Sequence, residues 1–280
     1  MNKKEKATLV LTALLKASAY VLVYFASQVL VGAIVGVVLA FTGTDAGEFM
    51  NTKIMELQTF ANVISVLCCI WLTRLMSKQG AGEGFRLNVD FAKRGKILAL
   101  CVAIGVFGQY VLTFLINVVI KFPQAWQDAL EENSELMGQS SFTALFVAVA
   151  IVAPLAEEII FRACVQGTLQ TQIPKWCAIL IASLVFGVMH GNPIGIIYAT
   201  LLGIFMGWLF AELDSINPSM LFHFAFNLTS VFITSLSPVI FVISILCLAL
   251  SVGYLIYLFV QNRKNPPLPN DFKGDNNEAL

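Results

Sequence analysis

The chain has 280 residues, of which 58% are hydrophobic and only 12% are charged. A soluble domain is about 45–50% apolar and about 25% charged, so this composition excludes a soluble globular protein. Its 17 basic and 17 acidic residues give a net charge of zero, and no nucleic-acid partner is expected. Apolar runs of about 20 residues recur along the chain and predict an all-α fold, a polytopic membrane bundle of about eight transmembrane helices.

Residues 1–141 are predicted to form generic membrane helices and interfacial segments. Residues 1–16 are basic and amphipathic, which is typical of a segment lying on the membrane surface. Three transmembrane helices are expected, at residues 18–41, 57–76 and 97–120. A basic loop, residues 77–96, separates the second from the third, and the acidic residues 121–141 predict a short interfacial helix.

Residues 142–236 are expected to form the core of the protein. Four transmembrane helices are predicted there, at residues 142–165, 176–190, 194–211 and 218–236. Residues 237–260 contain the last predicted transmembrane helix. Residues 261–280 include three prolines and many polar side chains, and this composition predicts a disordered tail.

The distribution of lysine and arginine predicts the orientation in the membrane. Basic residues gather at the N-terminus, in the 77–96 loop, in the 162–175 turn and just after the last span. Because cytoplasmic loops carry the excess of basic residues, both termini are expected in the cytoplasm of an integral plasma-membrane protein.

The two histidines of the chain and a pair of adjacent glutamates lie in apolar sequence of the predicted core. The glutamates are Glu157 and Glu158, and the histidines are His190 and His223, the latter four residues before Asn227. Ionisable groups are costly inside a bilayer, and they are therefore rare there and usually functional. The helix lengths allow the first glutamate and both histidines to meet between a third and half of the way across the membrane.

Helical spacing assigns different roles to the two glutamates. Adjacent residues on a helix point about 100° apart. Glu158 and Arg162 are four residues apart with the acid first, which is the favoured arrangement for an ion pair, so we assign both a supporting role. Glu157 has no cation at this spacing and is the candidate general base.

A carboxylate, two imidazoles and an amide within a membrane are compatible with three functions. They activate water and stabilise an oxyanion during peptide hydrolysis, with or without a metal. They also form interhelical hydrogen bonds in a non-proteolytic scaffold or immunity protein. A proton-coupled transporter is disfavoured, because the chain has no inverted repeat.

Three motifs in this order resemble those of the CPBP (Abi) family of intramembrane proteases, which includes the type II CAAX prenyl endopeptidases. They are Glu157-Glu158-Ile159-Ile160-Phe161-Arg162, Phe186-Gly187-Val188-Met189-His190 and His223-Phe224-Ala225-Phe226-Asn227. The resemblance implies a membrane endopeptidase whose cavity opens toward the cytoplasm. Its substrate would be a small peptide or a membrane-associated protein, as in bacteriocin or pheromone precursor processing or self-immunity.

The resemblance also implies roles for the residues of the motifs. Glu157 would activate water with the help of His190, and His223 and Asn227 would stabilise the oxyanion, with Phe186 in support. Proteases of this family are often called metalloproteases, but no compact zinc motif is present, and we favour a site without a cofactor. Zinc, if bound, would need Glu157, His190 and His223 as ligands. No oligomeric state follows from the sequence.

Overall fold

The structure is a computed structural model that describes residues 2–77 and 91–264. In this part of the chain all regular elements are helices, which confirms the all-α class. The predicted disordered tail lies outside the described residues except for Gln261–Lys264, which are helical and correct that prediction at its start. Most of the predicted 77–96 loop is also undescribed, but its last residues, from Phe91 onward, belong to a helix.

The described residues form eleven α-helices. In chain order they are α1 (Lys3–Thr42), α2 (Ala46–Ser77), α3 (Phe91–Phe114), α4 (Gln124–Gly138), α5 (Phe142–Leu145), α6 (Ala153–Glu157), α7 (Gly167–Gln170), α8 (Lys175–Val188), α9 (Pro193–Leu213), α10 (Asn217–Phe232) and α11 (Pro238–Lys264). Three π-helical segments, η1 (Leu115–Val119), η2 (Phe146–Val152) and η3 (Glu158–Gln166), continue or join them. As a result, the chain from Phe142 to Gln170 is one rod, and Glu157 lies near its middle.

Among the described residues, six helices are long and apolar enough to cross a membrane, so the predicted count of about eight is not confirmed. All eight predicted segments are helical, but α8 has 14 residues and α10 has 16. At about 1.5 Å per residue, α8 is about 21 Å long, less than the hydrocarbon thickness of about 30 Å. The hairpin of α8 and α9 therefore turns within the bundle.

The sequence predicted that the basic N-terminal segment lies on the membrane surface. In the structure this segment is the first part of α1. Asn2 begins α1 with a capping box, in which its side chain accepts a hydrogen bond from the Glu5 amide and the Glu5 side chain accepts one from the Asn2 amide. No proline follows before Gly43, which ends α1 at a positive φ of 67°. One helix of 40 residues results.

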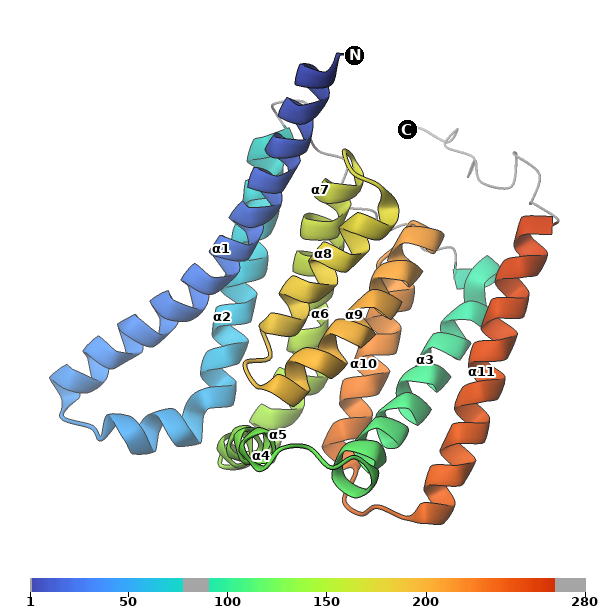
Figure 1. Cartoon of the computed structure of the whole chain (residues 1–280). Coiled ribbons are helices and arrows are strands. Elements are labelled where there is room, and N and C mark those ends of the chain that lie inside the picture. Colours follow the sequence, from blue (N-terminus) through green and yellow to red (C-terminus); the bar gives the residue numbers. More distant parts are fainter. Residues whose placement is uncertain (1, 78–90, 265–280) are drawn as a thin grey trace, which may run out of the picture.

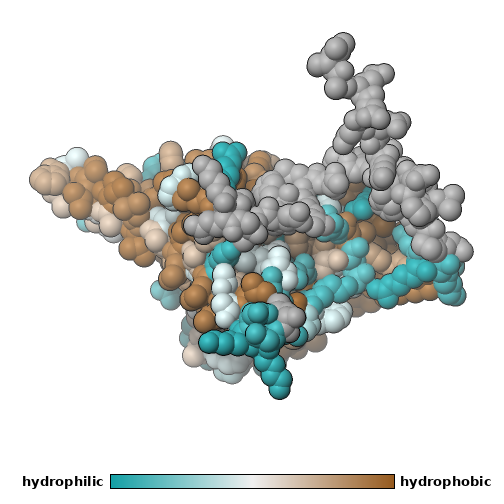
Figure 2. Space-filling model, turned by 90° about the horizontal axis from the view of Figure 1, so that it is seen from above, coloured by the Kyte–Doolittle hydropathy of each residue, from teal (hydrophilic) through white to brown (hydrophobic). Residues whose placement is uncertain are grey.

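The helices form a bundle with a projecting hairpin (Figure 1). The rod 142–170 and helices α8, α9 and α10 form its centre, α3 and α11 flank them, and α1 and α2 splay away toward one end. Helix α4 lies across that end, opposite the start of α1 and the end of α11. Seen from the end that carries the N-terminus, the projecting hairpin is covered mainly by hydrophobic side chains (Figure 2), as expected for a surface in contact with lipid.

Close helix contacts at glycine hold the core together. Gly203 of α9 faces Ser183 of α8, and Gly207 lies against Gln166 of η3, whose Nε2 donates to the Gly207 carbonyl at 2.8 Å. Gly105 of α3 similarly lets α10 approach. Small residues at such positions allow membrane helices to pack closely, and these contacts fix the helices that carry the histidines.

Candidate active site

The imidazole of His223 lies between the two adjacent glutamates. Its Nε2 is 3.5 Å from Glu157 Oε2, and its Nδ1 is 3.2 Å from Glu158 Oε1. The Glu158 side chain is fully buried and that of His223 is 6% exposed, whereas the Glu157 side chain is 17% exposed. Glu157 is thus the carboxylate of this group that faces open space, while Glu158 holds the histidine from within the protein.

Glu158 is in turn paired with Arg162, as the spacing predicts. Arg162 Nε lies 3.4 Å from Glu158 Oε2, and both side chains are fully buried. The guanidinium carbon also lies 4.9 Å from the centre of the Phe186 ring, within the range of a cation–π contact. The ion pair neutralises a buried carboxylate and fixes its direction toward the histidine.

His190 is held in the turn between α8 and α9. Its Nδ1 is 3.1 Å from the carbonyl oxygen of Phe186. A carbonyl oxygen only accepts, so this bond requires a proton on Nδ1 and leaves Nε2 for other partners. The rings of both His190 and His223 pack edge-on against Phe186, with centroid distances of 5.0 and 5.9 Å. Phe186 therefore sets the positions of the two imidazoles relative to each other.

Asn227, one turn beyond His223 on α10, contacts the rod. Its Nδ2 donates to the carbonyl oxygen of Val149 at 3.0 Å. Val149 belongs to the π-helical segment η2, and segments of this kind are frequent at functional sites. A carboxamide nitrogen carries two protons, so one N–H remains for another acceptor.

These side chains line a single cavity of about 540 Å³. Glu157, Phe186, His190, His223 and Asn227 all contribute to its wall. This group contains every residue to which the sequence assigned direct chemistry, but Glu158 and Arg162 lie behind the wall.

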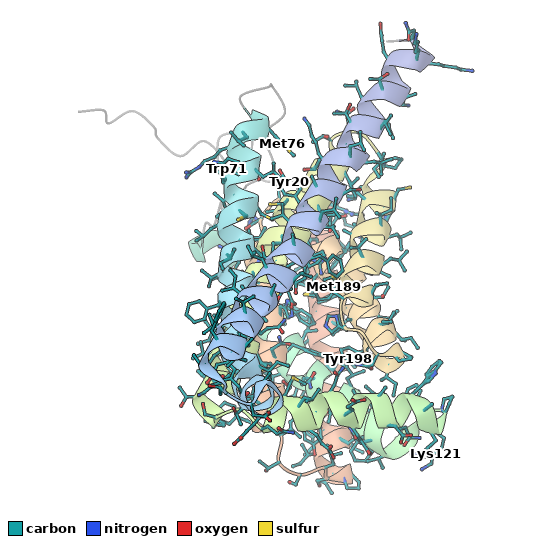
Figure 3. All side chains as sticks on the ribbon, turned by 90° about the vertical axis from the view of Figure 1, so that its left-hand side faces the viewer. Tyr20, Trp71, Met76, Lys121, Met189 and Tyr198 are labelled. Atoms are coloured by element: carbon teal, nitrogen blue, oxygen red, sulfur yellow. The ribbon has the colours of Figure 1, made fainter. Side chains whose placement is uncertain are left out.

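The cavity continues from the carboxylates to α4. Leu130, Asn133 and Met137 of α4 form part of its wall. Met189 and Tyr198 lie above α4, while Tyr20, Trp71 and Met76 lie toward the opposite end of the bundle (Figure 3). The cavity thus extends toward the end of the bundle away from the start of α1 and the end of α11.

This direction creates a conflict between two expectations from the sequence. With both termini in the cytoplasm, the α4 end would face the outer side of the membrane. A cavity that extends toward α4 and also opens toward the cytoplasm is incompatible with that orientation. The basic residues favour the cytoplasmic termini, and we keep that expectation.

Several residues of the cavity wall were not singled out in the sequence. Tyr198 packs against His190 with a centroid distance of 5.9 Å. Gln109, Thr113 and Asn117 line the wall from α3 and η1. In the sequence they form a pattern of three polar residues spaced four apart in an apolar run. This pattern alone indicates no chemistry, because the sequence does not show which helix faces it.

The three side chains expected as zinc ligands make other contacts in the structure. Both ring nitrogens of His223 already face carboxylates, and His190 Nδ1 faces a carbonyl oxygen. In residues 2–77 and 91–264, no three histidine, cysteine, aspartate or glutamate side chains are grouped so that they could hold a metal ion. The expected ligand set of Glu157, His190 and His223 is therefore not assembled.

An apolar helical bundle with a Glu–His centre in a cavity is compatible with an intramembrane hydrolase. Residues 139–229 match the sequence model of the family described as Type II CAAX prenyl endopeptidase Rce1-like. The chain is also 25% identical over 217 residues to "Putative membrane peptidase YdiL" of Bacillus subtilis (strain 168), covering 74% of this chain and 84% of that protein. No solved structure matches. The two matches support the resemblance to CPBP family proteases that the ordered motifs indicate.

Proposed function

We propose that this protein is an intramembrane endopeptidase that hydrolyses a peptide bond with water activated by Glu157. The observation that carries the proposal is the position of the Glu157 carboxylate. It is exposed to the cavity and lies 3.5 Å from an imidazole that a buried ion pair holds in place. A general base needs this combination of access to water and a fixed hydrogen-bonding partner.

The proposed reaction uses only water and protein side chains. Glu157 takes a proton from water as the water oxygen bonds to the substrate carbonyl carbon, and the carbonyl electron pair moves to oxygen. Collapse of this tetrahedral intermediate breaks the C–N bond, and the proton passes from Glu157 to the leaving amine. His223, held by Glu158, stabilises the glutamate as it gains and loses the proton.

We propose two roles that differ from those implied by the family resemblance. Both nitrogens of His223 face carboxylates, so this residue is better placed to assist Glu157 than to stabilise an oxyanion. The second N–H of Asn227 and Nε2 of His190 remain as donors toward the cavity, the latter when His190 is protonated. We propose that these two groups stabilise the oxyanion.

The substrate is a small peptide or a membrane-associated protein segment, processed in the plasma membrane. Bacteriocin or pheromone precursors belong to this class. Residues 142–236 are proposed as the catalytic core. Residues of α1 to α4, which lie outside this core, also line the cavity.

Replacement of Glu157 tests the proposal. Purified protein in detergent is given a panel of peptide precursors, and products are identified by mass spectrometry. Glu157→Gln keeps the size of the side chain but removes the base, and we expect the cleavage rate to fall by about 100- to 10,000-fold. Glu48→Gln, which changes an exposed glutamate at the start of α2, is the matched control and should cleave like the wild type. Equal cleavage by the Glu157 variant would exclude this residue as the base.

A non-proteolytic scaffold or immunity protein is the second candidate. It is favoured by the hydrogen bonds that His223 and Asn227 already make within the protein. Glu157→Gln and His223→Gln retain most hydrogen bonding but lose acid–base chemistry. Full biological function in both variants would favour the scaffold, whereas loss in both favours the protease.

A further inference from the structure

A polar stripe runs along the cavity wall on α3 and η1. It consists of Gln109, Thr113 and Asn117, and all three line the cavity. Gln109 Nε2 donates to Thr113 Oγ1 at 3.1 Å, and Asn117 Nδ2 donates to the Thr113 carbonyl oxygen at 2.8 Å. The stripe thus forms a connected row of polar groups in the apolar second half of α3 and in η1.

One acceptor atom of this row has no hydrogen-bond partner among the described residues. Gln109 is 9% exposed, and within the described part of the chain its buried Oε1 has no hydrogen-bond partner. Leaving a buried acceptor without a donor is unfavourable, and most such groups in proteins are satisfied. Gln109 also lines the cavity, so a turn of its side chain would bring this shielded oxygen to a donor supplied by a molecule in the cavity.

The stripe leads from the level of the catalytic residues toward α4. Helices α3 and α10 pack side by side, and a Cβ atom on Gly105 would lie only 2.6 Å from the Phe222 carbonyl oxygen. Both helices run toward the end where α4 lies (Figure 1). Gln109 is one turn farther along than Gly105, and Asn117 is about 12 Å beyond Gln109. His223 and Asn227 follow Phe222 in the same direction on α10.

We infer that Gln109, Thr113 and Asn117 form a binding site for the extended backbone of the substrate, with Gln109 Oε1 accepting a hydrogen bond from a substrate amide. An extended chain advances about 3.3 Å per residue, so the stripe accommodates about four residues between the scissile bond and α4. A lipid acyl chain carries no such donor, whereas a peptide offers one at every residue except proline. The inference rests on the proposed function and defines its substrate as an extended peptide segment that reaches the site from the α4 end.

The first test measures the hydrogen bond by kinetics. The probe is a pool of internally quenched peptides of about twelve residues, longer than the stripe. One cleaved member of the pool is then resynthesised with an N-methyl group at each backbone position in turn. Loss of one hydrogen bond should lower kcat/KM about tenfold, both for the peptide methylated at one position and for Gln109→Leu with the unmethylated peptide. In Gln109→Leu, methylation at that position should cause no further loss.

The control is a glutamine of another helix. Gln28 of α1 donates to Asn62 of α2 at 3.1 Å and is not part of the cavity wall. Gln28→Leu should therefore leave kcat/KM and the effect of methylation as in the wild type. If Gln109→Leu behaves like Gln28→Leu, the binding site is excluded while the proposed protease activity stands.

The second test does not require cleavage or a stable variant. The same peptides carry a benzophenone group and are photo-crosslinked to wild-type protein, with an excess of unlabelled peptide as competitor. We expect competable labelling within residues 109–117. Such labelling without any cleavage would support the binding site and exclude the protease, whereas absence of both labelling and cleavage would exclude both.

Discussion

At the scale of single residues, the site depends on one histidine with a carboxylate on each side. The sequence predicted the pair of Glu158 and Arg162, because an acid and a base four residues apart on a helix interact locally. It did not predict that Glu158 also contacts His223 at 3.2 Å. That contact joins residues 65 positions apart, so no local sequence pattern could predict it. The adjacent glutamates point in different directions, yet one imidazole fits between them.

The buried ion pair leads to a stability prediction. Arg162→Leu leaves the fully buried Glu158 without its cation, and we expect the free energy of unfolding to fall by about 3–5 kcal/mol. The double variant Glu158→Gln, Arg162→Leu removes both charges but keeps an acceptor for His223, so it should be more stable than Arg162→Leu alone. Denaturant titration in detergent measures both. A double variant less stable than the single one would show that the pair is not the source of the effect.

The engaged nitrogens of His223 also predict the response to chelators. If Glu157 is the general base and not a zinc ligand, peptide cleavage should be unchanged after full equilibration with phenanthroline. Stoichiometric zinc, with activity lost on its removal and restored on its return, would contradict the proposed mechanism and favour Glu157, His190 and His223 as ligands.

At the scale of the elements, hydropathy predicted the positions of the helices but not all of their lengths. Apolar runs identify a membrane helix because every backbone polar group must be satisfied within it. The continuous α1 and the short α8 depend instead on capping and on packing between helices. The π-helical segments around Glu157 were also not predicted, since they leave no periodic pattern in such short runs.

The hairpin of α8 and α9 gives a prediction about His190. A Cβ atom on Gly187 would clash with Thr200 Oγ1 and lie 2.8 Å from the Ile196 carbonyl oxygen. Gly187→Ala should push α8 away from α9 and displace His190, three residues later. A displacement of about 1 Å typically lowers the rate by about 100-fold. Gly36→Ala, at a helical glycine with no atom within 4 Å, is the control and should retain wild-type kcat/KM. Equal rates for the two variants would mean that the close contact does not position His190.

At the scale of the whole molecule, the cavity is lined partly by helices that were predicted only as generic membrane helices. Tyr24, Gln58 and Gln109 line it from α1, α2 and α3, and α4 closes part of its wall. The three motifs, whose spacing is local, contain candidate residues that line this cavity. The rest of the wall is formed by contacts between distant parts of the chain, which a single sequence does not reveal.

The orientation of the bundle is testable in intact cells. All six native cysteines are replaced, and single cysteines are introduced as Glu132→Cys on α4 or Lys6→Cys on α1, both at exposed positions. With cytoplasmic termini, a membrane-impermeant maleimide should label position 132 in intact cells and position 6 only after permeabilisation. The reverse pattern would place α4 and the cavity on the cytoplasmic side.

The most direct test of the account is peptide cleavage in oxygen-18 water, followed by mass spectrometry of the products. If Glu157 activates water for direct attack, each new carboxyl group formed by the wild-type protein carries one oxygen-18 atom, and Glu157→Gln forms almost no product. Labelled product at an undiminished rate from Glu157→Gln, or no product from the wild type with any peptide of the panel, would contradict the assignment of Glu157 as the base of an intramembrane endopeptidase.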